Sequence, residues 1–224
     1  MGIPERKERE KGQRREEILD AAQHVFFEKG LHVATMDEIA ERAELSKGTL
    51  YLYYKSKEDL YLAVVMRGME ILRELFTKVA KSGEPAVSML VALRDAYSSY
   101  FSNHREYFRM THFLQTPQFH KQVSDDMKKA AGELNRQVWD LVNGILQKCI
   151  DEGVLRKNLN PVEAGIILWS SATALLLRID SEYPIWKENF QIDLTQTLKL
   201  SNDLLFDSMC TADGRKAISA LANN

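Results

Sequence analysis

The chain has 224 residues, a formal net charge of −2 at pH 7 and two cysteines, Cys149 and Cys210. Its length suffices for one large or two small domains, and its near-neutral charge excludes a protein that coats nucleic acid by general attraction. Two cysteines without metal-ligand spacing exclude a disulfide scaffold and indicate a reducing cytoplasm.

The N-terminal residues carry charge without an apolar segment behind them, so we expect no signal peptide. Residues 1–13 lack apolar periodicity, which predicts a flexible tail. From Arg14 onward, apolar residues recur at helical spacing until Lys29 and Gly30, which form a C-terminal helix signal. The longest uncharged run, from Gly165 to Leu177, is too short to cross a bilayer, and we expect no membrane partner.

Two short helices joined by a tight turn are predicted between Thr35 and Tyr54. Thr35 and Glu38 have the spacing of a capping box, and Ser46 can cap the second helix, at about residues 47–54. In this second helix Leu50 and Tyr54 form the inward pair. The side chains left facing out are Lys47, Gly48, Thr49, Tyr51, Leu52 and Tyr53. Because this exposure gains nothing for folding, it predicts a helix-turn-helix whose second helix enters a DNA major groove.

From Arg15 to Leu60 the sequence resembles the tetracycline-repressor (TetR) family of bacterial regulators. The most specific part is Ser46-Lys47-Gly48-Thr49-Leu50-Tyr51-x-Tyr53-Tyr54-x-Ser56-Lys57-Glu58. The resemblance implies that bases and phosphates are contacted by Thr35, Ser46, Lys47, Gly48, Thr49, Tyr51, Tyr53 and Lys57, with Lys55 as an additional phosphate contact. Leu52 departs from a pattern that often has a polar or aromatic residue there, and it could meet a thymine methyl group.

With DNA as the partner, residues 1–13 have a second interpretation, an arm that touches the phosphate backbone. The glutamates between its basic residues favour the tail. The rest of the chain keeps a helical period, so the predicted fold is all-α. A long helix capped by Ser56 and Asp59 joins a head at residues 14–60 to a larger C-terminal domain at residues 61–224. Further helices are expected at about residues 87–101, 105–114, 124–152, 161–179 and 186–209.

The segment from Gly165 to Leu177 is apolar or small all the way round, so it must be covered on two sides. Its own domain can cover one side, and a second copy of the chain is the preferred cover for the other. The alternative is the central helix of a monomeric bundle. We therefore expect a homodimer through the helices around residues 161–179 and 187–209, which suits a protein that reads two half-sites.

Aromatic residues and methionine gather between Tyr97 and Phe113, as in the wall of a small-molecule cavity or in an ordinary core. The resemblance implies an effector in the C-terminal domain that releases the DNA. Candidate ligand contacts are Tyr100, His104, Phe108, His112, Trp139 and Trp169. The three histidines at positions 104, 112 and 120 recur in eight-residue steps that turn by about 80° each on a helix. With no metal spacing, phosphate loop or nucleophile elbow, we predict no catalytic residue, metal or cofactor.

The expected function is therefore that of a cytoplasmic, ligand-responsive transcriptional regulator. We expect a homodimeric repressor that is released from a palindromic operator by a small, largely apolar effector. The alternatives are an activator of the same fold, a helical protein–protein adaptor and an all-α enzyme. A steep fall of DNA affinity with salt would separate a DNA reader from an adaptor.

Overall fold

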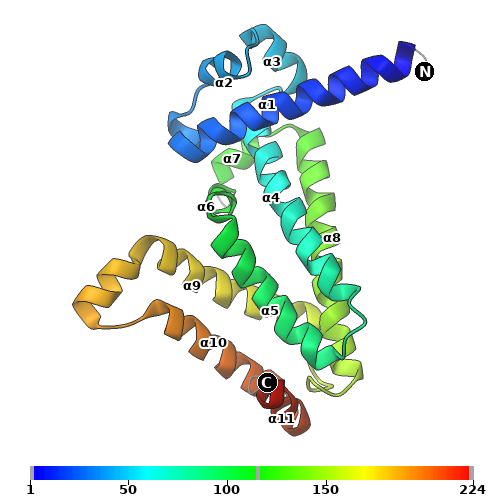
Figure 1. The fold of residues 1–224 in the computed structure, drawn as a ribbon, viewed down its shortest axis with the longest axis vertical. Coiled ribbons are helices and arrows are strands. Elements are labelled where there is room, and N and C mark those ends of the chain that lie inside the picture. Colours follow the sequence, from blue (N-terminus) through cyan, green and yellow to red (C-terminus); the bar gives the residue numbers. More distant parts are fainter. Residues whose placement is uncertain (1–2, 115–116, 222–224) are drawn as a thin grey trace. The chain divides into compact units, whose positions relative to one another are not determined.

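The computed structural model describes residues 3–114 and 117–221, with the backbone alone at residues 3, 4, 112, 113 and 117. The prediction of an all-α fold is confirmed, since all the helices and strands assigned in these residues are α-helices (Figure 1). They are α1 (Ile3–Val33), α2 (Met36–Arg42), α3 (Lys47–Tyr53), α4 (Lys57–Ala80), α5 (Ala86–Asn103), α6 (Arg105–Phe113), α7 (Pro117–Gln122), α8 (Asp125–Asp151), α9 (Pro161–Phe190), α10 (Leu194–Met209) and α11 (Ala212–Leu221).

The helices group into two compact units. The first, called the head unit below, contains the chain up to Ile71 together with His104–Arg136. The second, called the C-terminal unit, contains Leu72–Asn103 and the chain from Gln137 onward. Helices α4 and α8 each begin in the head unit and end in the C-terminal unit. The sequence predicts a boundary at residue 60, whereas the head unit also takes in more of α4, all of α6 and α7, and the start of α8.

The core of the head unit starts from α1, which turns apolar side chains inward at four-residue steps. Ile18, Ala22 and Phe26 are almost fully buried. The ring of Phe26 meets Tyr61 of α4 edge-on, with 5.0 Å between centroids. The Tyr61 hydroxyl donates to the backbone oxygen of Met110 in α6 at 3.0 Å. Helices α1, α4 and α6 therefore share one core.

The C-terminal unit has its own apolar core, built from the end of α4 and from α5, α8, α9 and α10. Its buried members include Phe76, Leu90, Ile145, Leu146, Cys149, Leu155, Ala164, Phe206 and Cys210. The thiol of Cys149 donates to the backbone oxygen of Ala86 at 3.3 Å, and burial raises the pKa of this thiol to about 12. Both cysteines are buried as free thiols.

Helix α1 starts earlier than the sequence predicts. Residues expected as a flexible tail are helical from Ile3, and the side chains from Glu5 to Glu16 are exposed. At the other end, Gly30 interrupts the helical geometry with φ 70°, a conformation that glycine adopts without strain. The predicted stop signal at Lys29 and Gly30 thus falls at a real break in the helix.

Two helix ends in the C-terminal unit also differ from the prediction. Helix α9 continues through Pro184 to Phe190, and Gln191 ends it in the left-handed conformation with φ 56°. Helix α10 therefore begins at Leu194, capped by Asp193, instead of near Trp186. The apolar spacing of Trp186 and Phe190 belongs to the last turn of α9, where their ring centroids lie 5.1 Å apart.

Two helical glycines of the C-terminal unit should respond in opposite directions to alanine. A Cβ atom at Gly214 would lie 2.2 Å from the backbone oxygen of Val154, whereas one at Gly144 would meet nothing within 4 Å. We expect Gly214→Ala to lower the free energy of unfolding by about 1–3 kcal/mol through overpacking. Gly144→Ala should raise it by up to about 1 kcal/mol through helix propensity. Urea unfolding of both variants checks this, and equal effects of the two would contradict the packing at α11.

Candidate nucleic-acid interface and effector site

The first helix of the predicted helix-turn-helix has the expected capping box. The backbone N–H of Glu38 donates to the Thr35 hydroxyl at 3.2 Å, and the N–H of Thr35 donates to the Glu38 carboxylate at 3.0 Å. Lys29 of α1 donates to the same carboxylate at 2.7 Å. The Lys29 hydrogen bond and then those of Thr35 lower the pKa of Glu38. The beginning of α2 is therefore fixed both to its own cap and to α1.

The turn and the second cap also follow the sequence pattern. Glu44 takes up the left-handed conformation with φ 54°, and the N–H of Leu45 donates back to the Ala40 oxygen at 2.9 Å. Ser46 caps α3, because its hydroxyl accepts from the N–H of Thr49 at 3.1 Å. The two hydroxyl groups of Ser46 and Thr49 also bond to each other at 2.8 Å. Ser46 and Thr49, two of the predicted DNA contacts, therefore lie together at the start of α3.

Helix α3 has one buried and one exposed face. Leu50 and Tyr54 are buried, as the sequence predicts. Leu52 is 84% exposed and Tyr51 is 44% exposed, which is unusual for such large side chains. The sequence predicts that Tyr53 faces out, but its side chain is half-buried. Tyr53 therefore contributes both to packing and to the surface. The side chains free to enter a groove are therefore chiefly those of the first turn together with Tyr51 and Leu52.

The three lysines expected at phosphates all have partners inside the head unit. Lys47 donates to Asp37 at 2.8 Å, and this hydrogen bond raises the lysine pKa. Lys55 lies 3.4 Å from Asp126. Lys57 is half-buried and donates to the backbone oxygen of Ala34 at 2.8 Å, so it also ties α4 to the end of α1. Lys47 and Lys55 are exposed and can exchange a carboxylate for a phosphate. Lys57 is instead held by its hydrogen bond to the backbone of Ala34.

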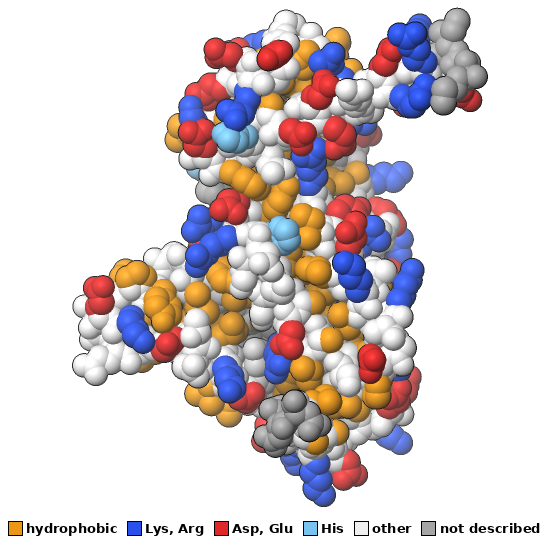
Figure 2. All heavy atoms as spheres, in the orientation of Figure 1, with side chains coloured by type: hydrophobic (Ala, Val, Ile, Leu, Met, Phe, Trp, Pro, Cys, Tyr) orange, Lys and Arg blue, Asp and Glu red, His pale blue; other side chains and the backbone are white. Residues whose placement is uncertain are grey.

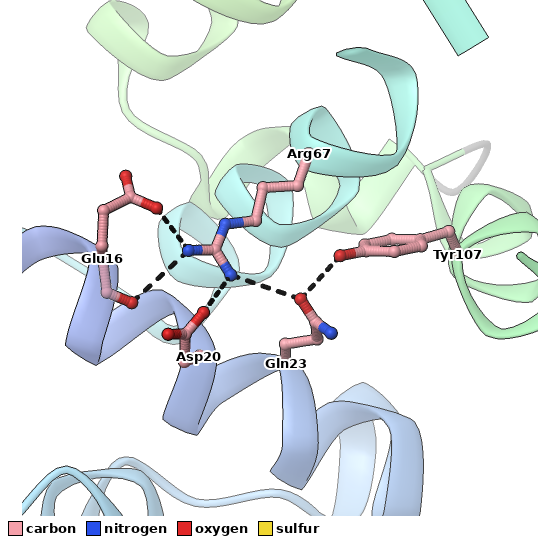
Figure 3. A network of polar contacts seen from close by, with 5 residues as sticks. All are labelled: Glu16, Asp20, Gln23, Arg67 and Tyr107. Carbon is pink, nitrogen blue, oxygen red and sulfur yellow. Dashed lines mark hydrogen bonds and ion pairs between the residues drawn. The ribbon is translucent and has the colours of Figure 1, made fainter. Parts of the chain in front are cut away.

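A polar network fastens α4 and α6 to α1 (Figure 3). The guanidinium group of Arg67 bonds Glu16 at 2.5 Å and Asp20 at 2.6 Å, and it reaches Gln23 at 3.3 Å. The Tyr107 hydroxyl donates to the same Gln23 oxygen at 2.6 Å. Sequence reasoning missed this network. The sequence signal for it is Arg67 itself, a charged residue at helical spacing between the apolar residues Val64 and Ile71.

A second set of contacts joins α7 and α8 to the head. The N–H of Ser124 donates to the Asp59 carboxylate at 2.7 Å, and Asp59 is only 1% exposed. The Ser56 hydroxyl, which also caps α4, donates to the backbone oxygen of Gln122 at 3.2 Å. A buried carboxylate is costly unless it is hydrogen-bonded, so Asp59 holds the start of α8 in place. These contacts explain why residues 104–136 belong to the head unit.

The structure separates the candidate ligand contacts into two groups. His104 and Phe108 lie in the head unit, with Phe108 buried and the His104 ring 6.5 Å from that of Tyr107. Tyr100, Trp139 and Trp169 lie in the C-terminal unit. The side chain of His112 is outside the described residues.

In the C-terminal unit, α8 and α9 are in close contact at the two tryptophans. The rings of Trp139 and Trp169 meet edge-on at 6.0 Å, and a Cβ atom at Gly165 would lie 3.1 Å from Trp139. The Tyr97 hydroxyl of α5 is hydrogen-bonded to Thr173 of α9 at 2.6 Å. Burial raises the pKa of Tyr97 to about 12, so it stays neutral.

One polar atom of the same unit was not singled out from the sequence. The side-chain oxygen of Asn143 is buried, and it accepts no hydrogen bond from any described residue. Asn143 lies one helical turn after Trp139 on α8. A buried carbonyl oxygen without a partner is costly, and it is a natural acceptor for a ligand N–H or O–H group.

Comparisons with known proteins identify the class of regulator. The family model "Bacterial regulatory proteins, tetR family" matches residues 18–64, which cover the capped helix pair. The HTH-type transcriptional regulator YfiR of Bacillus subtilis is 30% identical over 148 residues, or 64% of this chain and 68% of that protein. This chain belongs to the TetR family. The predicted family membership is thereby confirmed, and the protein is a helix-turn-helix transcriptional regulator.

Two further proteins similar to this TetR-family chain are described as an activator and as a repressor. The HTH-type transcriptional activator FasR of Mycolicibacterium smegmatis is 28% identical over 177 residues, covering 79% of this chain and 77% of that protein. The crystal structure of Thermus thermophilus FadR, a TetR-family repressor in complex with lauroyl-CoA, superposes with a TM-score of 0.63. It is 26% identical and covers 88% of this chain and 95% of that one.

The α9–α10 pair of this TetR-family chain exposes a large apolar surface (Figure 2). Its members, called the α9–α10 face below, are Val162, Ile166, Ile167, Trp169, Leu200 and Leu204, all 44–62% exposed. Within the described chain, α9 is the one helix long and apolar enough to cross a membrane by length and composition. Core helices of soluble proteins pass the same test, but only 17% of the relevant window of α9 is buried in the single chain. No described residue of the same chain covers the exposed part of α9.

The Lys47–Asp37 pair yields a test of the interface. Asp37→Asn removes the carboxylate that Lys47 contacts and leaves the lysine free for a phosphate. We expect tighter binding to any duplex DNA and a plot of log K against log salt that is steeper by up to about 0.9. Glu41→Gln is the matched control, because it removes the same charge from α2 without releasing Lys47. Fluorescence anisotropy at several salt concentrations measures both, and equal slopes for the two variants would remove Lys47 from the interface.

Proposed function

We propose that the protein is a homodimeric, cytoplasmic transcriptional repressor that binds a palindromic operator through α2 and α3 and is released by a long-chain acyl-CoA. The observation that carries the DNA-binding part is the capped α3, on which Lys47, Gly48, Tyr51 and Leu52 are exposed. The acyl-CoA part is supported by the similarity to the lauroyl-CoA complex of T. thermophilus FadR.

The C-terminal unit offers two features that support binding of an acyl-CoA. An acyl chain needs an apolar wall, and the pantetheine arm carries amide groups that need hydrogen-bond partners. Trp139 and Trp169 offer aromatic surface, and Asn143 offers a buried acceptor without a partner. We propose these three residues and Tyr100 as effector contacts, because all four lie in the C-terminal unit.

Activation is the second candidate output, favoured by the similarity to FasR of M. smegmatis. An activator and a repressor can share the same fold and the same effector. They differ in where the operator lies relative to the promoter and in whether the effector strengthens or weakens DNA binding.

Helix α4 is the proposed route from effector to DNA. It leaves the head unit and enters the C-terminal unit without a break. In a dimer, tilting both copies changes the distance between the two α3 helices. That distance must match half-sites about 34–36 Å apart on B-form DNA. A shift of a few ångströms therefore lowers operator affinity without changing any base contact.

The effector and the DNA should oppose each other by the same factor. For a switch worth about 1–3 kcal/mol, lauroyl-CoA should weaken operator binding by about 5- to 150-fold, and operator DNA should weaken lauroyl-CoA binding equally. Titration calorimetry with and without operator DNA measures both arms. Coenzyme A without an acyl chain is the control.

Each result of these titrations has a separate meaning. Lauroyl-CoA binding that is unchanged by operator would refute the switch. Equal binding of coenzyme A and lauroyl-CoA would refute the apolar effector. If operator affinity rises with lauroyl-CoA, the proposed output is activation and not repression.

The dimer is proposed through the α9–α10 face, four helices in all. An obligate interface of this kind buries about 2,000 Å² or more, and the exposed apolar side chains of α9 and α10 supply its centre. Leu204 is 62% exposed, so Leu204→Asp leaves the monomer intact while placing a charge in the interface. We expect this variant to sediment as a monomer at micromolar concentration.

Val33→Asp is the matched control for the dimer, because Val33 is 67% exposed and lies in the head unit. It should sediment like the unmodified protein. An unmodified protein that is already monomeric, or a Leu204→Asp variant that stays dimeric, would remove the α9–α10 face from the assembly.

A further inference from the structure

The first turns of α1 are exposed on every side. From Glu5 to Glu16 each side chain is exposed, and in Figure 1 this part of α1 extends beyond α2 and α3 of the same unit. From Glu5 to Glu16 there are six basic and four acidic residues, so the segment is positively charged. A helix without a buried face gains no stability from packing, which leaves its charge as the property to explain.

The basic residues of this segment fall on two different sides of the helix. At 100° per residue, Lys7 and Lys11 both lie within about 20° of the direction of Ile18, which is fully buried in the head. Lys11 also shares its direction, to within about 20°, with Lys29, whose amino group bonds Glu38 of α2. Lys7 and Lys11 therefore face the side of α1 on which the helix-turn-helix lies.

The opposite side of α1 carries the carboxylate of Asp20. Asp20, which holds the guanidinium group of Arg67, is about 180° from Lys11 around the helix. Arg6 and Arg9 each lie within about 40° of Asp20 and so point to the side of α1 that holds Arg67. The segment thus has one basic pair directed toward the helix-turn-helix and another directed away from it.

The pair facing the helix-turn-helix continues toward α3. Arg15 follows Lys7 and Lys11 at four-residue steps, and its guanidinium group lies 5.9 Å from the ring centroid of Tyr54, the C-cap of α3. Arg6 pairs with Glu10 at 2.8 Å, whereas neither Lys7 nor Lys11 has an ion-pair partner among the described residues. Two unneutralised ammonium groups therefore form a line that leads away from the end of the recognition helix.

We propose that Lys7 and Lys11 form a second phosphate-binding site, which contacts the DNA backbone beside the groove that α3 enters. This proposal rests on the proposed DNA binding by α3. Lys7 stands about 16 Å before Ile18 along the helix, so the site lengthens the contact with DNA by several phosphates. Its partner is the sequence-independent phosphate backbone, because lysine on an exposed helix reads charge and not base edges.

The test uses the full-length protein and a 40-base-pair duplex of random sequence, since the expected contact is independent of sequence. The double variant Lys7→Ala/Lys11→Ala should lower the slope of log K against log salt by about 1.8, or 0.9 for each lost phosphate contact. At 0.1 M salt its affinity should fall about 10- to 100-fold. The matched control is Arg6→Ala/Arg9→Ala, which removes the same charge from the same turns on the other side and should change the slope by less than about 0.5.

The outcomes separate this site from the proposed function. Equal slopes for the two double variants would overturn the assignment to one side of α1, and unchanged slopes for both would overturn the site altogether. In either case, retention of steep salt dependence that Lys47→Ala reduces would leave DNA binding by α3 in place. An unmodified protein that shows no salt-dependent binding to duplex DNA would refute both. Circular dichroism of all variants shows whether helix content is retained.

Discussion

The arrangement of the head unit depends on the bonds between the guanidinium group of Arg67 and the carboxylates of Glu16 and Asp20. This group is partly buried and stays charged at every physiological pH. The surrounding helices must therefore supply acceptors for its N–H groups. Burial alone would lower the pKa of Arg67, but its hydrogen bonds with Asp20 and Glu16 outweigh this and raise it. Because all its partners lie on α1, Arg67 sets where α4 leaves the head. Gln23 then passes the same constraint to α6 through Tyr107.

Helix α6 belongs to the head unit, although the sequence predicts it in the C-terminal domain. The chain passes between the two units within α4, within α8 and at the short connection between Asn103 and His104. Two of the three crossings are continuous helices, whereas the third joins α5 to α6 through a single non-helical residue. Within the head unit, α4 is bonded to α1 through Arg67, and α6 is bonded to α1 through Tyr107 and Gln23. Both contacts belong to the Arg67 network.

The local part of the head could be predicted from the sequence. Capping by Thr35 and Ser46 and the inward direction of Leu50 depend on residues three or four positions apart, which a sequence displays directly. The assignment of residues 104–136 to the head could not be predicted, because it depends on pairs such as Tyr107 with Gln23 and Asp59 with Ser124, which are 84 and 65 residues apart. The sequence predicts too early an end for α9, because the helix tolerates Pro184 in its interior. The DNA, effector and dimer contacts remain predictions for the same physical reason: each depends on a partner outside the chain.

The buried state of Cys149 and Cys210 has a practical consequence. Thiol-reactive labels attack the thiolate, and burial keeps these two thiols both inaccessible and protonated at neutral pH. A cysteine introduced on the surface would thus be the preferred site of modification without prior removal of the native ones. A spin label or fluorophore placed on α3 of each copy can therefore report the spacing between the recognition helices of the proposed dimer in solution, with the native core left unchanged.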